Sequence, residues 1–126
     1  YKEFYNGRYF YTDFDYNNFL SQLRQEFSSE IRIKLLLCSD EKIDIDKYSD
    51  FPVFQIDNAN FIEDLYGLSK CDYIIGPPST YSMWASFYGQ KPILAIENKS
   101  CIVKKMDFSI AISINKLSNG YTFIWE

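Results

Sequence analysis

One stretch decides the fold, because it predicts a strand that passes into a helix: Asp72-Tyr-Ile-Ile-Gly-Pro-Pro-Ser-Thr-Tyr-Ser-Met-Trp-Ala85. Its apolar opening predicts a short buried strand, and the proline pair that follows excludes helix for the residues just before it. Ser79 or Thr80 is a good N-cap for a helix over 81–88, which we expect Gly89 to close. A strand that passes through a rigid turn into a helix is typical of α/β domains.

The amino-terminal side of this stretch repeats the same alternation. Thr12 resembles an N-cap, and apolar residues at helical spacing follow it over 13–28. Residues 31–38 predict a strand whose second half is buried on both faces. Residues 51–56 predict another strand. The segment between these strands, 42–50, fits either a short helix or an irregular loop.

The carboxyl-terminal side predicts a strand over 92–96 and then a hairpin. The hairpin joins residues 108–114 to 121–125 around the turn Ser118-Asn119-Gly120. The complete order of helices and strands predicts one α/β domain over 1–126, with helices in layers around a mainly parallel sheet. In such folds ligands bind beyond the carboxyl ends of the strands.

Composition narrows the classes of function. The net charge is −4 and the basic residues are scattered, which argues against nucleic acid as a partner. No apolar run approaches the ~20 residues of a membrane span, so we expect peripheral membrane association at most. Three cysteines and no histidine predict reduced thiols in a cytoplasmic protein, no bound metal, and no histidine-dependent step within this chain.

Aromatic residues are abundant, with 11 Tyr, 11 Phe and 2 Trp. A chain of this size does not bury all of them, so some are expected at the surface. A ligand groove, a surface for a partner and an aromatic-rich core all fit this composition.

The turn between the predicted strand and the helix is the first candidate site. Free N–H groups and the helix dipole at a helix N-terminus favour an anion, to which the hydroxyls of Ser79, Thr80 and Ser82 add donors. Gly76 would let the backbone approach a ligand closely. A diphosphate fits these groups, and an ordinary capped turn explains them equally well. Ser39 and Asp40 follow another strand and belong to the same expected edge of the sheet.

The preceding helix carries the second candidate, Asp64. Asn60 is predicted to cap this helix with Glu63 at the capping-box position. One apolar face is formed by Phe61, Leu65 and Leu68. The Asp64 carboxylate has only acceptors, so it suits two adjacent N–H donors such as the N1–H and N2–H edge of guanine. A solvated acid near a helix N-terminus is the alternative.

Residues 64–80, Asp-Leu-Tyr-Gly-Leu-Ser-Lys-Cys-Asp-Tyr-Ile-Ile-Gly-Pro-Pro-Ser-Thr, resemble the donor-binding stretch of GDP-fucose-dependent fucosyltransferases. The family pattern is an Asp that begins "D-x-x-x-L-S-x-x-D", a hydrophobic strand and a Ser/Thr-rich turn. Residues 79–85, Ser-Thr-Tyr-Ser-Met-Trp-Ala, also resemble the "S-T-F-S-x-W-A" signature of the bacterial α1,2-type enzymes. Leu37-Cys-Ser-Asp40 stands where the family has a strand ending in Ser/Thr-Asp. The likeness extends over residues 1–98.

The resemblance implies a Rossmann-like domain, the C-terminal half of a GT-B fold, that binds GDP-fucose without a metal or other cofactor. It implies guanine contact at Asp64 and diphosphate contact at Ser79, Thr80, Tyr81 and Ser82. The family's "H-x-R-R-x-D" motif would lie just before Tyr1, so the catalytic residues and the acceptor groove are expected in a preceding half. We therefore expect a donor-binding fragment, inactive alone, of an enzyme that fucosylates a glycan acceptor in surface polysaccharide synthesis.

Other functions fit less well. A response-regulator receiver needs a full helix and strand between its acidic residues, whereas Asp40 and Asp57 are only 17 residues apart. A calcium loop at 40–46 lacks the central Gly and closing Glu of an EF-hand. The alternative that stays open is a non-catalytic α/β module of the same ancestry for carbohydrate binding or assembly, which would use exposed Tyr and Trp residues.

Overall fold

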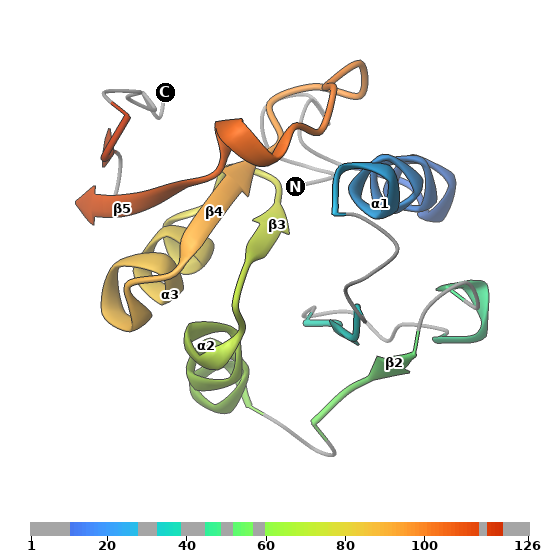
Figure 1. The fold of residues 1–126 in the computed structure, drawn as a ribbon. Coiled ribbons are helices and arrows are strands. Elements are labelled where there is room, and N and C mark those ends of the chain that lie inside the picture. Colours follow the sequence, from blue (N-terminus) through green and yellow to red (C-terminus); the bar gives the residue numbers. More distant parts are fainter. Residues whose placement is uncertain are drawn as a thin grey trace.

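The computed structural model describes residues 11–27, 33–38, 45–48, 52–56, 60–113 and 116–119 (Figure 1). Three α-helices and two one-turn 3-10 helices occur in these ranges: α1 (Asp13–Glu26), η2 (Ile45–Tyr48), α2 (Phe61–Lys70), α3 (Thr80–Gly89) and η3 (Lys105–Asp107). The strands are β1 (Leu35–Leu36), β2 (Val53–Phe54), β3 (Ile74–Gly76), β4 (Pro92–Ala95), β5 (Ser109–Ser113) and β6 (Lys116–Leu117). The α/β class predicted from the sequence is confirmed.

The described strands form two sheets. β1 and β2 pair in parallel, and a separate sheet has the order β3-β4-β5-β6. Within it β3 and β4 are parallel, whereas β4–β5 and β5–β6 are antiparallel. The prediction of one mainly parallel sheet is therefore wrong, and the larger sheet is mixed. Between β4 and β5 the described chain forms only the one-turn helix η3, and it re-enters the sheet in the opposite direction.

Helices cover both faces of the larger sheet (Figure 1). Side chains alternate along β4 because successive residues of a strand point to opposite faces. Leu94 and the following Ile96 belong to a core with α1, while Ile93 belongs to a second core with Met83 and Ala85 of α3. The sheet thus lies between α1 on one side and α2 with α3 on the other.

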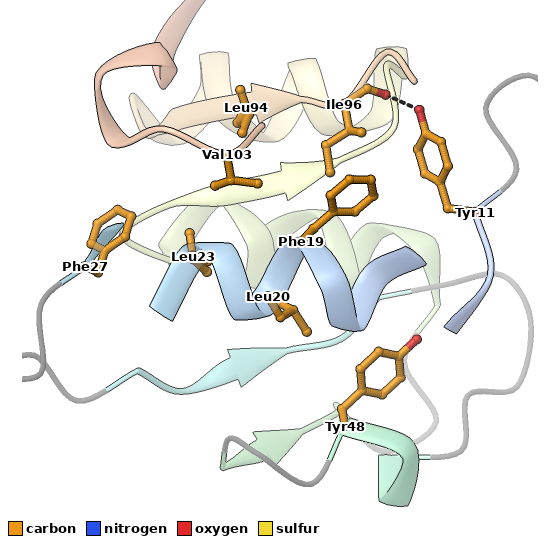
Figure 2. Packing of buried hydrophobic residues seen from close by; sticks show 9 residues of the cluster. All are labelled: Tyr11, Phe19, Leu20, Leu23, Phe27, Tyr48, Leu94, Ile96 and Val103. Atoms are coloured by element: carbon orange, nitrogen blue, oxygen red, sulfur yellow. Dashed lines mark hydrogen bonds between the residues drawn. The ribbon is translucent and has the colours of Figure 1, made fainter. Parts of the chain in front are cut away.

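The helix α1 is defined by local signals that the sequence carries. The Thr12 hydroxyl accepts from the Asp15 N–H and the Asp15 carboxylate accepts from the Thr12 N–H, which forms a complete capping box. Phe19 and Leu23 point from α1 into the core (Figure 2). The predicted helix over 13–28 is confirmed to within two residues of its end.

Contacts distant in sequence hold α1 against the sheet. The Tyr11 hydroxyl donates to the Ile96 carbonyl, as the dashed line in Figure 2 shows. Farther along the helix, the Val103 N–H donates to the Gln22 side-chain oxygen at 2.8 Å. In the last turn the Glu26 carboxylate accepts from the Lys105 N–H at 2.9 Å. These contacts give hydrogen-bond partners to three main-chain groups between β4 and β5, namely the carbonyl of Ile96 and the N–H groups of Val103 and Lys105.

The helices α2 and α3 lie unusually close at their carboxyl ends. A Cβ built on Gly89 would lie 2.1 Å from the Ser69 carbonyl oxygen, so only glycine fits there. The left-handed conformation after α3 belongs to Gln90, with φ of 55°. The expectation that Gly89 follows α3 and closes it is therefore wrong. Gly89 is the last residue of the helix, and its missing side chain allows α3 to approach α2 closely.

Three further expectations differ from the structure. Residues 35–38 are half-buried, not buried on both faces, because β1 pairs with β2 alone among the described strands, in a small separate sheet. Leu65 and Leu68 pack against the core, but Phe61 is exposed because it occupies the first turn at the helix end. Besides β4, β5 pairs with β6 (Lys116–Leu117), so the chain turns back before the predicted turn at 118–120, and the predicted partner 121–125 lies outside the described residues.

Replacing Gly89 by Ala tests the close approach of α2 and α3. Alanine favours a helix over glycine by up to ~1 kcal/mol. The clash with the Ser69 backbone has no rotamer that relieves it, and overpacking of this kind costs about 1–3 kcal/mol or more. We expect Gly89→Ala to lower the free energy of unfolding measured by urea titration.

The matched control is Gly76→Ala. The nearest atom to a Cβ built there is the Ser82 Oγ at 4.0 Å, which is ordinary contact. We expect this change to alter the free energy of unfolding by less than about 1 kcal/mol. Equal effects of the two substitutions would contradict the assigned role of Gly89.

Candidate functional site

The turn between β3 and α3 is organised around Ser79. The Ser79 hydroxyl accepts from the Ser82 N–H at 3.0 Å and donates to the Ser82 Oγ at 3.0 Å. Ser79 is thus the N-cap of α3, as one of the two residues predicted for that place. Its hydroxyl is already used in these bonds, so its contribution to a ligand would come through the shape of the turn.

The next residues of α3 provide donors that the helix itself does not use. In the first turn of any α-helix the N–H groups lack acceptors within the helix. In α3 the Ser79 side chain accepts from one of them, the N–H of Ser82. The N–H groups of Thr80 and Tyr81 therefore point out of the helix end, where its dipole favours an anion. The Thr80 side chain is exposed. The Ser82 hydroxyl accepts from Ser79, so the proton of the Ser82 hydroxyl stays available for a further hydrogen bond.

The first turn of α2 lies beside the first turn of α3. The Tyr81 hydroxyl donates to the Phe61 carbonyl at 2.7 Å, which joins the two helix starts directly. Asn60 caps α2 by accepting from the N–H groups of Ile62 and Glu63. The capped N-termini of α2 and α3 therefore lie next to each other, one tyrosine side chain apart, and the two helix dipoles are parallel.

Asp64 lies in this first turn of α2 and is half-buried. Its carbonyl accepts from the Cys38 thiol at 3.9 Å, which brings the residue that follows β1 against α2. Burial, with a contribution from the Asp64 carboxylate, raises the pKa of Cys38 to about 12. Burial likewise raises the pKa of Tyr81, and Asp64 and then Cys38 add to that shift. The cluster of Asp64, Cys38 and Tyr81 is thus coupled electrostatically.

The structure brings together most of the residues singled out from the sequence. Asp64 and Tyr81 share one cluster, and Ser79, Thr80 and Ser82 form the adjoining turn. Gly76 ends β3 directly before it and has room for a close approach. Ser39 and Asp40 lie outside the described residues, although Cys38, directly before them, reaches the cluster.

Sequence reasoning missed Cys38 and the Phe61 carbonyl. A cysteine in an apolar strand carries no signal of its position relative to a helix 26 residues away. The bond to Phe61 involves a main-chain oxygen, which every residue has. The available signal was Tyr81 at the second position of α3, because the hydroxyl of a partly buried tyrosine usually finds an acceptor.

The carboxyl end of β4 lies at the same edge of the sheet, because the Ile96 N–H donates to the Gly76 carbonyl at 2.7 Å. A hollow of about 270 Å³ opens beyond it toward β6. Its lining exposes more apolar than polar surface and consists of Leu94, Ala95, Glu97, Asn98, Cys101, Asp107, Leu117 and Asn119. Four of these residues, Glu97, Asn98, Asp107 and Asn119, contribute carboxylate and amide groups. These groups are suited to sugar hydroxyls, which accept and donate hydrogen bonds.

Within the described ranges, no group of three or more Cys, Asp or Glu side chains is arranged to hold a metal ion. None of the helices in the described part of the chain is long and apolar enough to cross a bilayer. Comparison with protein-family models, with curated proteins and with solved structures gave no match.

The raised pKa of Cys38 predicts how stability depends on pH. The folded state keeps the Cys38 proton up to about pH 12, whereas a cysteine in the unfolded chain loses it near its ordinary pKa of about 8.5. The contribution of Cys38 to the free energy of unfolding is therefore fully present below about pH 8.5 and declines as the pH rises from there. We expect Cys38→Ala to make the alkaline decline in stability shallower.

Urea titrations at about pH 8 and about pH 10.5 measure this change. Loss of the sulfur also costs packing energy, but that loss is independent of pH and cancels when slopes are compared. An alkaline slope that is the same in wild type and Cys38→Ala would contradict burial of the thiol.

Proposed function

We propose that this chain is the nucleotide-sugar-binding domain of a glycosyltransferase, with GDP-fucose as the donor. The observation that carries the proposal is the bond from Tyr81 to Phe61, which holds two helix N-termini side by side with Asp64 in the first turn of one. In α/β folds ligands bind at this edge, beyond the carboxyl ends of the strands. In this proposal the chain is the Rossmann-like C-terminal half of an enzyme with a GT-B fold.

The diphosphate of the donor would bind the start of α3. Its oxygens are strong acceptors, and the N–H groups of Thr80 and Tyr81 with the Thr80 and Ser82 hydroxyls are the donors available there. Helix N-termini bind phosphate through such N–H groups together with the dipole. Gly76, which precedes the turn, leaves space for the phosphates to approach the backbone.

The guanine base would bind Asp64. A carboxylate accepts two parallel hydrogen bonds, and guanine presents two adjacent donors, N1–H and N2–H. Uracil presents one donor flanked by acceptors, and adenine lacks the adjacent pair of donors. Half-burial of Asp64 strengthens the discrimination, because a wrong base would leave the carboxylate partly desolvated without partners.

In the proposed reaction the bond between the sugar's anomeric carbon and the diphosphate oxygen breaks, and a hydroxyl of a glycan acceptor takes its place. The departing GDP carries away the bonding electron pair, so negative charge grows on the diphosphate. The N-terminus of α3 would stabilise that charge. The acceptor groove, the catalytic base and further cationic groups belong to the proposed N-terminal half of the same protein, acting in the synthesis of a surface polysaccharide.

Isothermal titration of the 126-residue chain with GDP, UDP and ADP tests the base assignment. We expect GDP to bind most tightly, and Asp64→Asn to weaken it by about 10- to 100-fold, since a hydrogen bond to a charged group contributes ~1.5–3 kcal/mol. The substitution keeps the shape of the side chain and leaves its main-chain bonds intact, so the free energy of unfolding should change little.

The matched control is Asp46→Asn, which removes one negative charge at an exposed position of η2, outside the stretch 64–80 that resembles the donor-binding sequence. It should leave the GDP affinity unchanged. Tighter binding of UDP or ADP than of GDP, or a GDP affinity that Asp64→Asn does not lower, would contradict the proposal.

A further inference from the structure

The solvent side of α2 and α3 is apolar and aromatic. Its large side chains are between 40% and 71% exposed, and we call them the outer face: Ile62, Tyr66, Trp84, Phe87 and Tyr88. On α2, residues 62 and 66 are one turn apart on the same side, and on α3 the same holds for 84, 87 and 88. The face lies on the opposite side of the two helices from the sheet that they cover.

The two helices form one continuous surface because they are joined at both ends. The Tyr81 hydroxyl bonds the Phe61 carbonyl at their starts, and Gly89 meets the Ser69 carbonyl at their ends. The rings of Trp84 and Phe87 already stack edge to face, with centroids 5.8 Å apart, so part of the face is ordered before any partner arrives.

The exposed area of the outer face is large for a single copy. A fully accessible aromatic side chain has on the order of 200 Å², so the five side chains at their measured exposure present roughly 500 Å². That is near the upper end for the largest apolar patch of a typical monomer. Complete burial of the face on two copies would remove about 1,000 Å² from solvent, which reaches the lower limit for a specific interface.

Two charged side chains of α2 make the face complementary to itself, and the ammonium of one of them, Lys70, lies 5.2 Å from the centroid of the Tyr66 ring. Glu63 lies in the first turn of α2 and Lys70 in its last, both exposed, seven residues and two turns apart along the solvent side. A two-fold axis across the middle of α2, near Tyr66, places Glu63 of one copy beside Lys70 of the other, and the reverse pair forms by symmetry. The same axis sets the two α2 dipoles antiparallel, which is favourable.

We propose that the outer face is the interface of a symmetric homodimer, with α2 of one copy antiparallel to α2 of the other. Trp84, Tyr88 and Tyr66 are its central anchors, since aromatic residues at the centre of an interface contribute most of the binding energy. Glu63 and Lys70 fix the direction and register of the pair. The nucleotide cluster at Asp64 lies beside this interface and is not part of it.

Sedimentation velocity of the 126-residue chain, from about 1 to 100 µM, measures the association. We expect a dimer with a dissociation constant of roughly micromolar order, as for interfaces at the small end of the stable range. Trp84→Lys should raise that constant by at least about tenfold, because it puts a charge at the desolvated centre. Met106→Lys is the matched control, at an exposed apolar residue of η3, and should have no effect.

A charge-reversal cycle tests the symmetry. Glu63→Lys brings two lysines together at each contact between residues 63 and 70 and should weaken the dimer, and Lys70→Glu should do the same with two carboxylates. The double variant Glu63→Lys/Lys70→Glu restores both pairs and should dimerise within about threefold of wild type. Helical content measured by circular dichroism verifies that each variant is folded.

A wild type that stays monomeric over the whole concentration range overturns the proposal. So does a dimer that Trp84→Lys leaves intact, because another surface must then hold it. A monomeric Trp125→Phe variant, in which Trp84 is the sole tryptophan, whose fluorescence responds to an added oligosaccharide would assign the face to a carbohydrate and reject the second copy. Weakening by both single reversals without rescue in the double variant would reject the antiparallel arrangement.

Discussion

The contact between Gly89 and the Ser69 carbonyl is the constraint on which the arrangement of α2 and α3 depends. Without a side chain at Gly89, the last turn of α3 lies directly on the backbone of α2. The Tyr81 hydroxyl joins the first turns of the same helices to the Phe61 carbonyl. Two contacts at opposite ends fix both the distance and the parallel direction of the pair. The coincidence of two helix N-termini at one edge of the sheet is a result of this packing.

A buried hydroxyl connects the helix pair to the sheet. Ser86 of α3 is completely buried, donates to the Lys91 carbonyl at 2.5 Å and accepts from the Ala111 N–H at 3.0 Å. Polar groups without water must find such partners, and this one satisfies main-chain groups before β4 and within β5. Because β5 is held against α3 in this way, the third strand of the sheet is placed by a helix as well as by its neighbour β4.

The signals that could be predicted from sequence are local. The caps at Thr12, Asn60 and Ser79 each act within three residues, so helix starts were predictable, and the α/β class followed from them. The antiparallel return of β5 depends on contacts such as Ser86 to Ala111, 25 residues apart, and no local pattern specifies it. The candidate site shows the same division. Its residues were recognisable by type, whereas the packing of Cys38 on α2 was not.

The attachments of α1 have a consequence for how the chain is assembled during synthesis. The bonds from Gln22 to Val103 and from Glu26 to Lys105 join residues 81 and 79 positions apart, and Tyr11 reaches Ile96 across 85. The unit α2–β3–α3–β4 is made of neighbours in sequence, for which loop closure costs little. A ribosome therefore delivers α1 before α2 and α3, but the apolar side of α1 has no complete partner until Phe108, which packs against the same core, has been added. Among α1, α2 and α3, the helix that is made first is the last to be docked.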